Sequence, residues 1–226
     1  MDLDNLLFTF ANADIAARYW PDILAGMRMT LALSVLVTLA GLSLGLLLVL
    51  LRSLGWRALN IPIVIFADVM RALPPLIIII MLFFAFPYLN FSMSAFTATW
   101  LALTLVLAAY TEESLWAAIC AVPPGQQEAA RSSGLSWWQC MTCVILPQAW
   151  RMALPSLTNR VIGVAKNTAL GSVVALSEIL NNAQSASSNA GNPTPLVLGA
   201  LAYLVILIPV VLMSRWLETR MAWRQQ

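Results

Sequence analysis

The chain is organised around a polar stretch that reads PPGQQEAARSSGLSWWQ from Pro123 to Gln139, inside an otherwise apolar sequence. Pro123 and Pro124 should end the preceding helix, because a proline inside a helix removes a hydrogen-bond donor and clashes with the previous turn. Pro124 can also be the first residue of a new helix, where no backbone N–H is needed. The stretch therefore predicts a break followed at once by a short helix.

The same stretch contains the signals of a second short helix. Gly134 suits the left-handed position that follows a helix end, so the first helix should run to about Ser133. Ser136 and Gln139 have the spacing of a capping box, which opens a helix. Pro147 should end that second helix. We predict two short helices joined by a glycine corner, lying between two membrane spans.

The composition is that of a membrane protein. Hydrophobic residues make up 61% of the 226 residues and charged residues 10%, and the mean hydropathy is +0.83. Soluble domains have about 25% charged residues. We expect an all-α integral membrane protein, a bundle of about five transmembrane helices in a single domain over residues 1–226. The approximate spans are 24–51, 60–88, 94–118, 154–176 and 196–214.

The segments around these spans carry further signals. Residues 1–20 should be an amphipathic approach to the membrane, and residues 177–195 a polar loop. Gly41 and Gly45 have the GxxxG spacing that lets another helix approach closely, although two ordinary membrane glycines remain an alternative. The adjacent prolines at 74 and 75 should break the second span, as in the discontinuous helices of transporters.

Basic residues in the connecting segments set the orientation. Arginines occur in the first loop, in the segment that begins with the polar stretch and extends to Arg151, and in the tail, while the loops after the second and fourth spans have no Lys or Arg. By the positive-inside rule the N-terminus should lie outside and the C-terminus in the cytoplasm. The start of the chain lacks the basic region of a signal peptide, so none is expected. The arginines counted are Arg52, Arg57, Arg131, Arg151, Arg215, Arg220 and Arg224.

The cysteine and histidine content argues against a metal site or an enzyme. Cys140 and Cys143 have Cys-x-x-Cys spacing, but there is no second pair and no histidine in the sequence. Two reduced thiols on a short cytoplasmic helix are the simpler interpretation. We expect no catalytic residues and no metal ligands. The sequence also has no P-loop, so any ATP must be bound by another chain.

The polar stretch resembles the EAA loop of permeases of ATP-binding-cassette (ABC) importers. Glu128-Ala129-Ala130 is followed after three residues by Gly134 and later by Leu146-Pro147. The surrounding sequence, including Lys166-Asn167-Thr168, narrows the resemblance to the polar-amino-acid permeases. In that family the loop, here residues 123–147, is a coupling helix segment that contacts the ATPase. The coupling residues implied are Gly125, Gln126, Glu128, Ala129, Ala130, Gly134, Leu135, Trp137, Trp138 and Pro147.

The resemblance implies a function and a set of partners. The chain should be the membrane-spanning subunit of an ATP-driven importer for polar amino acids in a bacterial inner membrane. Implied partners are a dimer of ATPase subunits that binds ATP and Mg²⁺, a second permease of the same or homologous sequence, and an extracytoplasmic amino-acid-binding protein. No cofactor in this chain and no nucleic acid is implied. A permease for another solute and a self-contained secondary carrier remain alternatives.

Ionisable residues inside the predicted spans are candidates for the substrate path. Arg71 could bind a substrate carboxylate, or Asp68, three residues earlier, could simply neutralise it. Glu113 lies in a Tyr-x-x-Glu pattern that resembles the family's third span, where Trp116 here replaces the usual arginine. Glu113 should therefore pair elsewhere, with Lys166 or Arg160, or contact a substrate ammonium.

The predicted fourth span carries a polar face. Asn159, Gly163, Lys166 and Asn167 are spaced i, i+4, i+7 and i+8, which places them on one side of a helix. That face should look into the bundle, toward a partner subunit or the substrate path, which makes Lys166 and Asn167 candidate path residues. Which amino acid is carried, and whether the permease pairs with itself or a homologue, stays open.

Overall fold

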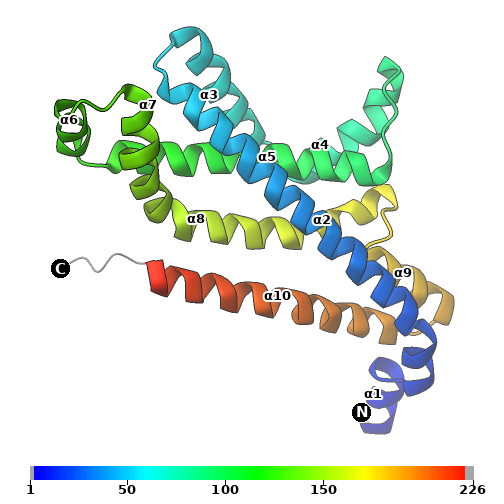
Figure 1. The fold of residues 1–226 in the computed structure, drawn as a ribbon. Helices are drawn as coiled ribbons and strands as arrows, with labels where there is room; N and C mark the ends of the chain where they lie inside the picture. The colour runs from blue at the N-terminus through cyan, green and yellow to red at the C-terminus, as the bar shows by residue number, and fades with distance from the viewer. Residues whose placement is uncertain (1–2, 222–226) are drawn as a thin grey trace. The chain divides into compact units, whose positions relative to one another are not determined.

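The computed structural model describes residues 3–221 and contains helices and no strand over that range, as the sequence predicts (Figure 1). The described chain forms two compact units. The first unit comprises the chain up to Leu39 with Leu73–Thr104 and Ile162–Val211, and the second comprises Ala40–Ala72, Leu105–Val161 and the chain from Leu212. Arg224, used above for the orientation, lies outside the described residues. The helices in chain order are α1 (Leu3–Phe10), α2 (Ala13–Ser53), α3 (Arg57–Ala72), α4 (Pro75–Ile80), η1 (Met81–Ala85), η2 (Phe86–Leu89), α5 (Ala95–Ala121), α6 (Pro124–Ser132), α7 (Trp137–Cys140), η3 (Met141–Ile145), α8 (Leu146–Asn167), η4 (Thr168–Val174), α9 (Ile179–Ala190) and α10 (Thr194–Met221).

Among the described residues, three helical segments are long and apolar enough to cross a membrane: Phe8–Ser53, Ala95–Ala121 and Thr194–Trp216. The pair Arg57–Ala72 and Pro75–Leu89 qualifies as a fourth, broken span. The helix α8, which carries most of the span predicted at 154–176, does not qualify. The structure therefore shows three or four candidate spans where the sequence predicted about five, because α8 is too polar along its length.

The first span begins earlier than predicted. Asn12 caps α2, since its side-chain oxygen accepts hydrogen bonds from the backbone N–H groups of Asp14 and Ile15. From this cap α2 runs unbroken to Ser53. Residues 13–20, which were expected to be part of an amphipathic approach, are instead the first turns of the long helix.

The predicted break in the second span is confirmed. Helix α3 ends at Ala72, and α4 begins at Pro75, with Pro74 in an extended conformation (φ −57°, ψ 132°) as its N-cap. A residue that precedes a proline is sterically pushed out of the helical region, so the Pro74-Pro75 pair forces this interruption.

The turn between α6 and α7 is as predicted. Gly134 has φ +86°, and the N–H groups of Gly134 and Leu135 donate to the carbonyls of Arg131 and Ala130, which satisfies the end of α6. Ser136 and Gln139 form both hydrogen bonds of the capping box at the start of α7. Figure 1 shows α7 continuing into α8.

The end of the second short helix was predicted wrongly, because Pro147 does not stop it. The π-helical turn η3 joins α7 to α8, and the N–H of Leu146 donates to the carbonyl of Met141, five residues earlier. This wider turn leaves room for the proline ring, which would otherwise clash with the carbonyl four residues before it. Helical structure therefore runs on past Pro147 to Asn167.

The predicted polar loop at 177–195 is also wrong, because it contains α9. The buried Glu178 caps this helix by accepting hydrogen bonds from the N–H groups of Leu180 (2.8 Å) and Asn181 (2.7 Å). The hydroxyl of Tyr203 donates a third hydrogen bond to the same carboxyl. Burial raises the pKa of the Glu178 carboxyl above its usual value, and these three hydrogen bonds act in the opposite direction.

Helix α9 completes the core of the first unit. Ile179 and Ala183 are fully buried against Ile23 of α2 and Ala202 and Ile206 of α10. The contact is close: a Cβ added at Gly26 would lie 2.9 Å from the backbone of Ile179, and one at Gly199 would lie 2.8 Å from the Cβ of Ala183. Three segments distant in the sequence are thus held together by small residues.

The second unit packs α2 against α5 in the same way. A Cβ added at Gly41 would lie 2.8 Å from Leu107, and one at Gly45 would lie against Thr111 and 2.7 Å from the carbonyl oxygen of Ala108. The close approach predicted from the GxxxG spacing is therefore confirmed within the chain. The core below it comprises Val49, Leu115, Ala118, Val122, Ala130, Cys140, Met141, Ile145, Ala149, Ala153 and Leu157.

We expect Gly45→Ala to destabilise the second unit, because its methyl group has no space between α2 and α5. Overpacking of this kind costs about 1–3 kcal/mol, which outweighs the gain of up to about 1 kcal/mol in helix propensity. The matched control is Gly163→Ala, because a Cβ there would have no neighbour within 4 Å. Thermal unfolding of the purified variants in detergent should show a lower midpoint for Gly45→Ala alone. Equal midpoints would contradict the packing.

Candidate functional site

The exposed face of α6 carries four of the ten predicted coupling residues. Gly125, Gln126, Glu128 and Ala129 are exposed, whereas Ala130 is buried in the core of the second unit. The Glu-Ala-Ala triplet is therefore divided: its last residue anchors the helix, and its first two face outward. The geometry leaves one side of α6 free for a partner.

The two tryptophans of α7 have different surroundings. The Trp137 ring packs against the core of the second unit, and Trp138 is 52% exposed. The rings meet edge to face at 5.1 Å between centroids. Leu135 is half-buried at the corner, and Pro147 is exposed at the start of α8. Of the apolar side chains of Leu135, Trp137 and Trp138, which belong to the predicted coupling residues, that of Trp138 is the most available to a partner.

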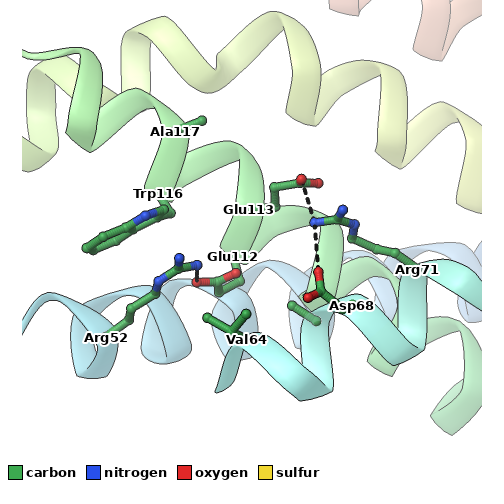
Figure 2. A pocket seen from close by; sticks show the side chains of 9 residues that line it. Arg52, Val64, Asp68, Arg71, Glu112, Glu113, Trp116 and Ala117 are labelled. Carbon is green, nitrogen blue, oxygen red and sulfur yellow. Dashed lines mark hydrogen bonds and ion pairs between the residues drawn. The ribbon is translucent and has the colours of Figure 1, made fainter. Parts of the chain in front are cut away.

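A cavity of about 280 Å³ lies among α2, α3 and α5 in the second unit (Figure 2). Val64, Ala67, Trp116 and Ala117 form its apolar walls. Its charged lining consists of three carboxylates and two guanidinium groups. These are Asp68, Glu112, Glu113, Arg52 and Arg71.

Glu112 and Arg52 form the buried pair of this cavity. The Glu112 carboxylate is 1% exposed, and its Oε1 lies 2.8 Å from Nη1 of Arg52, which is 20% exposed. The Arg52 guanidinium also stacks on the Trp116 indole at 4.3 Å, a favourable cation–π contact (Figure 2). Glu112 Oε2 is buried, and no residue in the described part of the chain forms a hydrogen bond with it. The charge on Glu112 thus depends on one arginine.

Arg71 and Glu113, both predicted for the substrate path, pair with each other at 2.5 Å. Asp68 lies 3.9 Å from Arg71 on its other side (Figure 2). The pairing of Glu113 with Lys166 or Arg160, which the sequence suggested, is therefore wrong. Asp68 lies close enough to Arg71 to contribute to its neutralisation, as the structural alternative for Arg71 expected, but the main partner of Arg71 is Glu113.

Arg160 instead lies over the ring of Tyr110, 3.9 Å from its centroid. One helical turn along, the hydroxyls of Ser114 and Ser156 are hydrogen-bonded at 2.9 Å. These four side chains, Tyr110 and Ser114 from α5 with Ser156 and Arg160 from α8, form a polar seam within the second unit. Arg160 is exposed and forms no ion pair with any described carboxylate.

The remaining predicted path residues lie at the end of α8. Lys166 is exposed and Asn167 is half-buried, and neither lines the cavity. Asn159 is exposed, and its side-chain amide donates to the carbonyl of Pro155. At Asn159 and Lys166, the polar face predicted for this helix is therefore exposed and not covered by other parts of the described chain. Its role in the path stays a prediction.

Neither the Arg52–Glu112 pair nor the seam was predicted from the sequence. Arg52 was assigned to a loop, although a carboxylate at position 112 of an apolar helix requires a cationic partner. The seam has a weaker signal. Tyr110 and Ser114 are spaced i, i+4, as are Ser156 and Arg160, but only the packing of α5 on α8 brings the two pairs together.

No group of three or more His, Cys, Asp or Glu among the described residues is placed to hold a metal ion.

Comparison with known sequences places this arrangement among transport proteins. Residues 41–223 match the family model described as binding-protein-dependent transport system inner membrane component. The probable amino-acid ABC transporter permease protein YckA of Bacillus subtilis is 37% identical over 173 residues, which cover 76% of each chain. The histidine/lysine/arginine/ornithine transport system permease protein HisM of Escherichia coli is 32% identical over 230 residues, covering 94% of this chain and 96% of its own.

Solved structures give the same result. The crystal structure of an amino acid ABC transporter with histidines contains a chain that superposes with a TM-score of 0.82 at 30% identity, covering 90% of this chain and 96% of its own. The MetNI methionine ABC transporter, in an inward-facing conformation, matches with a TM-score of 0.66 at 19% identity over 92% of this chain and 97% of its own. The second match shows a shared fold.

We expect Arg52→Gln to destabilise the protein strongly, because it leaves the Glu112 carboxylate buried without its cation. Breaking a buried pair from one side costs about 3–5 kcal/mol. Adding Glu112→Gln to that variant removes the unpaired charge and should recover much of the loss. Thermal unfolding in detergent measures both effects.

The control for this prediction is Arg57→Gln, since Arg57 is exposed and forms no ion pair with a described carboxylate. Its unfolding midpoint should stay close to that of the unmodified protein. A double variant no more stable than Arg52→Gln alone would show that the buried charge is not the cause.

Proposed function

The chain belongs to the family of binding-protein-dependent transport system inner membrane components, and we propose that it is the membrane-spanning subunit of an importer for polar amino acids. Its relatives and its structural neighbours are permease subunits of amino acid ABC importers. Such a permease is a transport component and not an enzyme, and the ATPase is a separate subunit. The observation that carries the proposal is the match to the amino acid ABC transporter over 90% of the chain.

The proposed arrangement has five crossings, with the N-terminus outside, α8 as the fourth crossing and α6 and α7 on the cytoplasmic side. The distribution of arginines supports this orientation. A helix as polar as α8 is tolerated in a bilayer only where protein or water covers its polar groups. The second permease of the complex and the substrate path between the two subunits would provide that cover.

The proposed partners follow from the family. A dimer of ATPase subunits binds ATP and Mg²⁺ on the cytoplasmic side, a second permease of the same or homologous sequence completes the path, and an extracytoplasmic binding protein delivers the amino acid. The complex would reside in a bacterial inner membrane. The relatives are named for different solutes. HisM of Escherichia coli is named for histidine, lysine, arginine and ornithine, and ArtQ of Haemophilus influenzae, 33% identical, is named for arginine alone. The solute of this chain therefore has to be inferred from its own residues.

The coupling loop is suited to act as a lever. Ala130, Cys140 and Met141 bury one side of it in the same core as α5 and α8, while the opposite side, with Glu128 and Trp138, is exposed. A segment held this rigidly moves together with the helices that follow it. Movement of the ATPase subunits against the exposed side would therefore be transmitted directly to α8, which follows without a break.

The proposal is tested by reconstituting the permease with its ATPase and binding protein in liposomes and measuring ATP hydrolysis and uptake with acidic, basic, amide and neutral polar amino acids. Stimulation of both by one class is the expected result. ATP hydrolysis without uptake of any amino acid would move the substrate to another class of solute.

The coupling loop is tested by Gly134→Val. Gly134 has φ +86°, and a β-branched residue in this left-handed conformation is strained by roughly 1–2 kcal/mol, so the corner should distort. We expect ATP hydrolysis to continue while uptake per ATP hydrolysed falls severalfold. Glu128→Gln, on the exposed face, should act in the same direction without backbone strain.

The matched control is Gly55→Val. Gly55 has a similar φ of +77° but lies between α2 and α3. The valine substitution there therefore introduces the same strain away from the coupling loop. Uptake per ATP hydrolysed should be retained in this variant. An equal loss in the Gly55 and Gly134 variants would point to general destabilisation instead of coupling.

A further inference from the structure

We propose that the polar seam of α5 and α8 is a binding site for the substrate, that Arg160 binds a carboxylate there, and that the substrate is an amino acid with an anionic side chain. The inference rests on the proposed function, since it assumes that an amino acid passes this chain. It adds the class of substrate and the residue that selects it.

The first observation is the state of Arg160. Its guanidinium is exposed and forms no ion pair with any described carboxylate, in contrast to Arg52 and Arg71, which are both paired. The stack on Tyr110 at 3.9 Å holds the plane of the guanidinium in place. Stacking leaves the N–H groups at the edge of that plane free to donate. An arginine fixed in this way is suited to bind a carboxylate through two parallel hydrogen bonds.

The second observation is the composition of the seam around it. Ser114 and Ser156, one turn along each helix, are hydrogen-bonded to each other at 2.9 Å. One of the two hydroxyl hydrogens is used in that bond, and the other remains available to a ligand. The seam thus offers hydroxyl and guanidinium donors side by side. Donors without an opposing carboxylate are the pattern of an anion site.

The third observation is the balance of charge on the two helices. The carboxylates of α5 are Glu112 and Glu113, and each is paired with an arginine from another helix of the second unit. The charge of Arg160 is therefore not compensated within that unit. An amino acid with a neutral side chain has no net charge, and a cationic one would be repelled. Arg151, also on α8 in this unit, likewise forms no ion pair with a described carboxylate, so this part of α8 carries an excess of positive charge. A dicarboxylic amino acid carries one net negative charge, which this excess attracts.

The position of Arg160 on a membrane protein excludes exposure to lipid as the explanation. A guanidinium facing hydrocarbon is costly, so it must face water or a partner group. A carboxylate of the second permease could supply that group in place of the substrate. This is the outcome that the experiment must separate from substrate binding.

The test measures binding to the assembled permease and ATPase complex in lipid nanodiscs, without the binding protein, so that only the permease selects the ligand. The probes are radiolabelled L-glutamate, L-glutamine and L-arginine. L-Glutamate and L-glutamine have nearly the same shape and differ in charge. We expect L-glutamate to bind most tightly, and Arg160→Gln to weaken it by about tenfold or more, with little change for L-glutamine.

Two further variants test the contribution of the Tyr110 ring and the specificity of the effect for Arg160. Tyr110→Leu removes the stacking partner and should weaken L-glutamate binding in the same direction by a smaller factor. Arg151→Gln is the control: Arg151 is also exposed on α8 but lies about two and a half turns away, on the opposite side of the helix. It should leave the preference for L-glutamate over L-glutamine unchanged.

Three results would overturn the inference: L-arginine or L-glutamine binding as tightly as L-glutamate, L-glutamate binding that survives Arg160→Gln, or loss of the second permease from the Arg160→Gln complex. The last would assign Arg160 to the subunit interface. ATP-driven uptake separates this failure from failure of the proposed function. Uptake of another class of amino acid would overturn the inference alone, whereas hydrolysis without uptake of any amino acid would overturn both.

Discussion

A charged side chain in a membrane protein must be paired or must face water, and this constraint explains the arrangement of the second unit. Glu112 is almost completely buried, and Arg52 reaches it from the end of α2. Arg71 of α3 is held by Glu113 of α5 in the same cavity. The two ion pairs join three helices at one place, so the positions of α2 and α3 against α5 depend on charge as well as on apolar packing.

The same core extends from these helices to the coupling loop. Buried residues of α6 and of the turn η3 continue the apolar contacts of α5 and α8, and the other side of the loop, with Glu128 and Trp138, is exposed. Rigidity on one side and exposure on the other are consistent with the proposed role of this loop in coupling. The π-helical turn before Pro147 matters here, because it keeps the chain helical from α7 to the end of α8.

The charged side chains of the cavity and of the seam differ in one respect. Those of the cavity form ion pairs, whereas Arg160 in the seam forms none with a described carboxylate. The paired groups join helices, and the role of Arg71 and Glu113 in the substrate path stays a prediction. Arg160, held by an aromatic ring instead of a carboxylate, keeps its donors available. Arg71, the more obvious candidate in the sequence because it lies next to a proline break, is one of the paired groups.

The sequence by itself determined the features that depend on neighbours along the chain. The glycine corner at Gly134, the capping box of Ser136 and Gln139 and the break at Pro74 are local properties of backbone geometry, and they were predicted correctly. Of the five predicted spans, three correspond to continuous apolar helices and a fourth to a broken pair among the described residues. Helix α9 was missed because its cap, Glu178, and its apolar side are stabilised by Ile23 and Tyr203, which are far away in the sequence. Only the tertiary structure decided the partners of the charged side chains. Pairing depends on which helices lie side by side, and no spacing within one helix records that Glu112 meets Arg52, that Glu113 meets Arg71, or that Arg160 meets Tyr110.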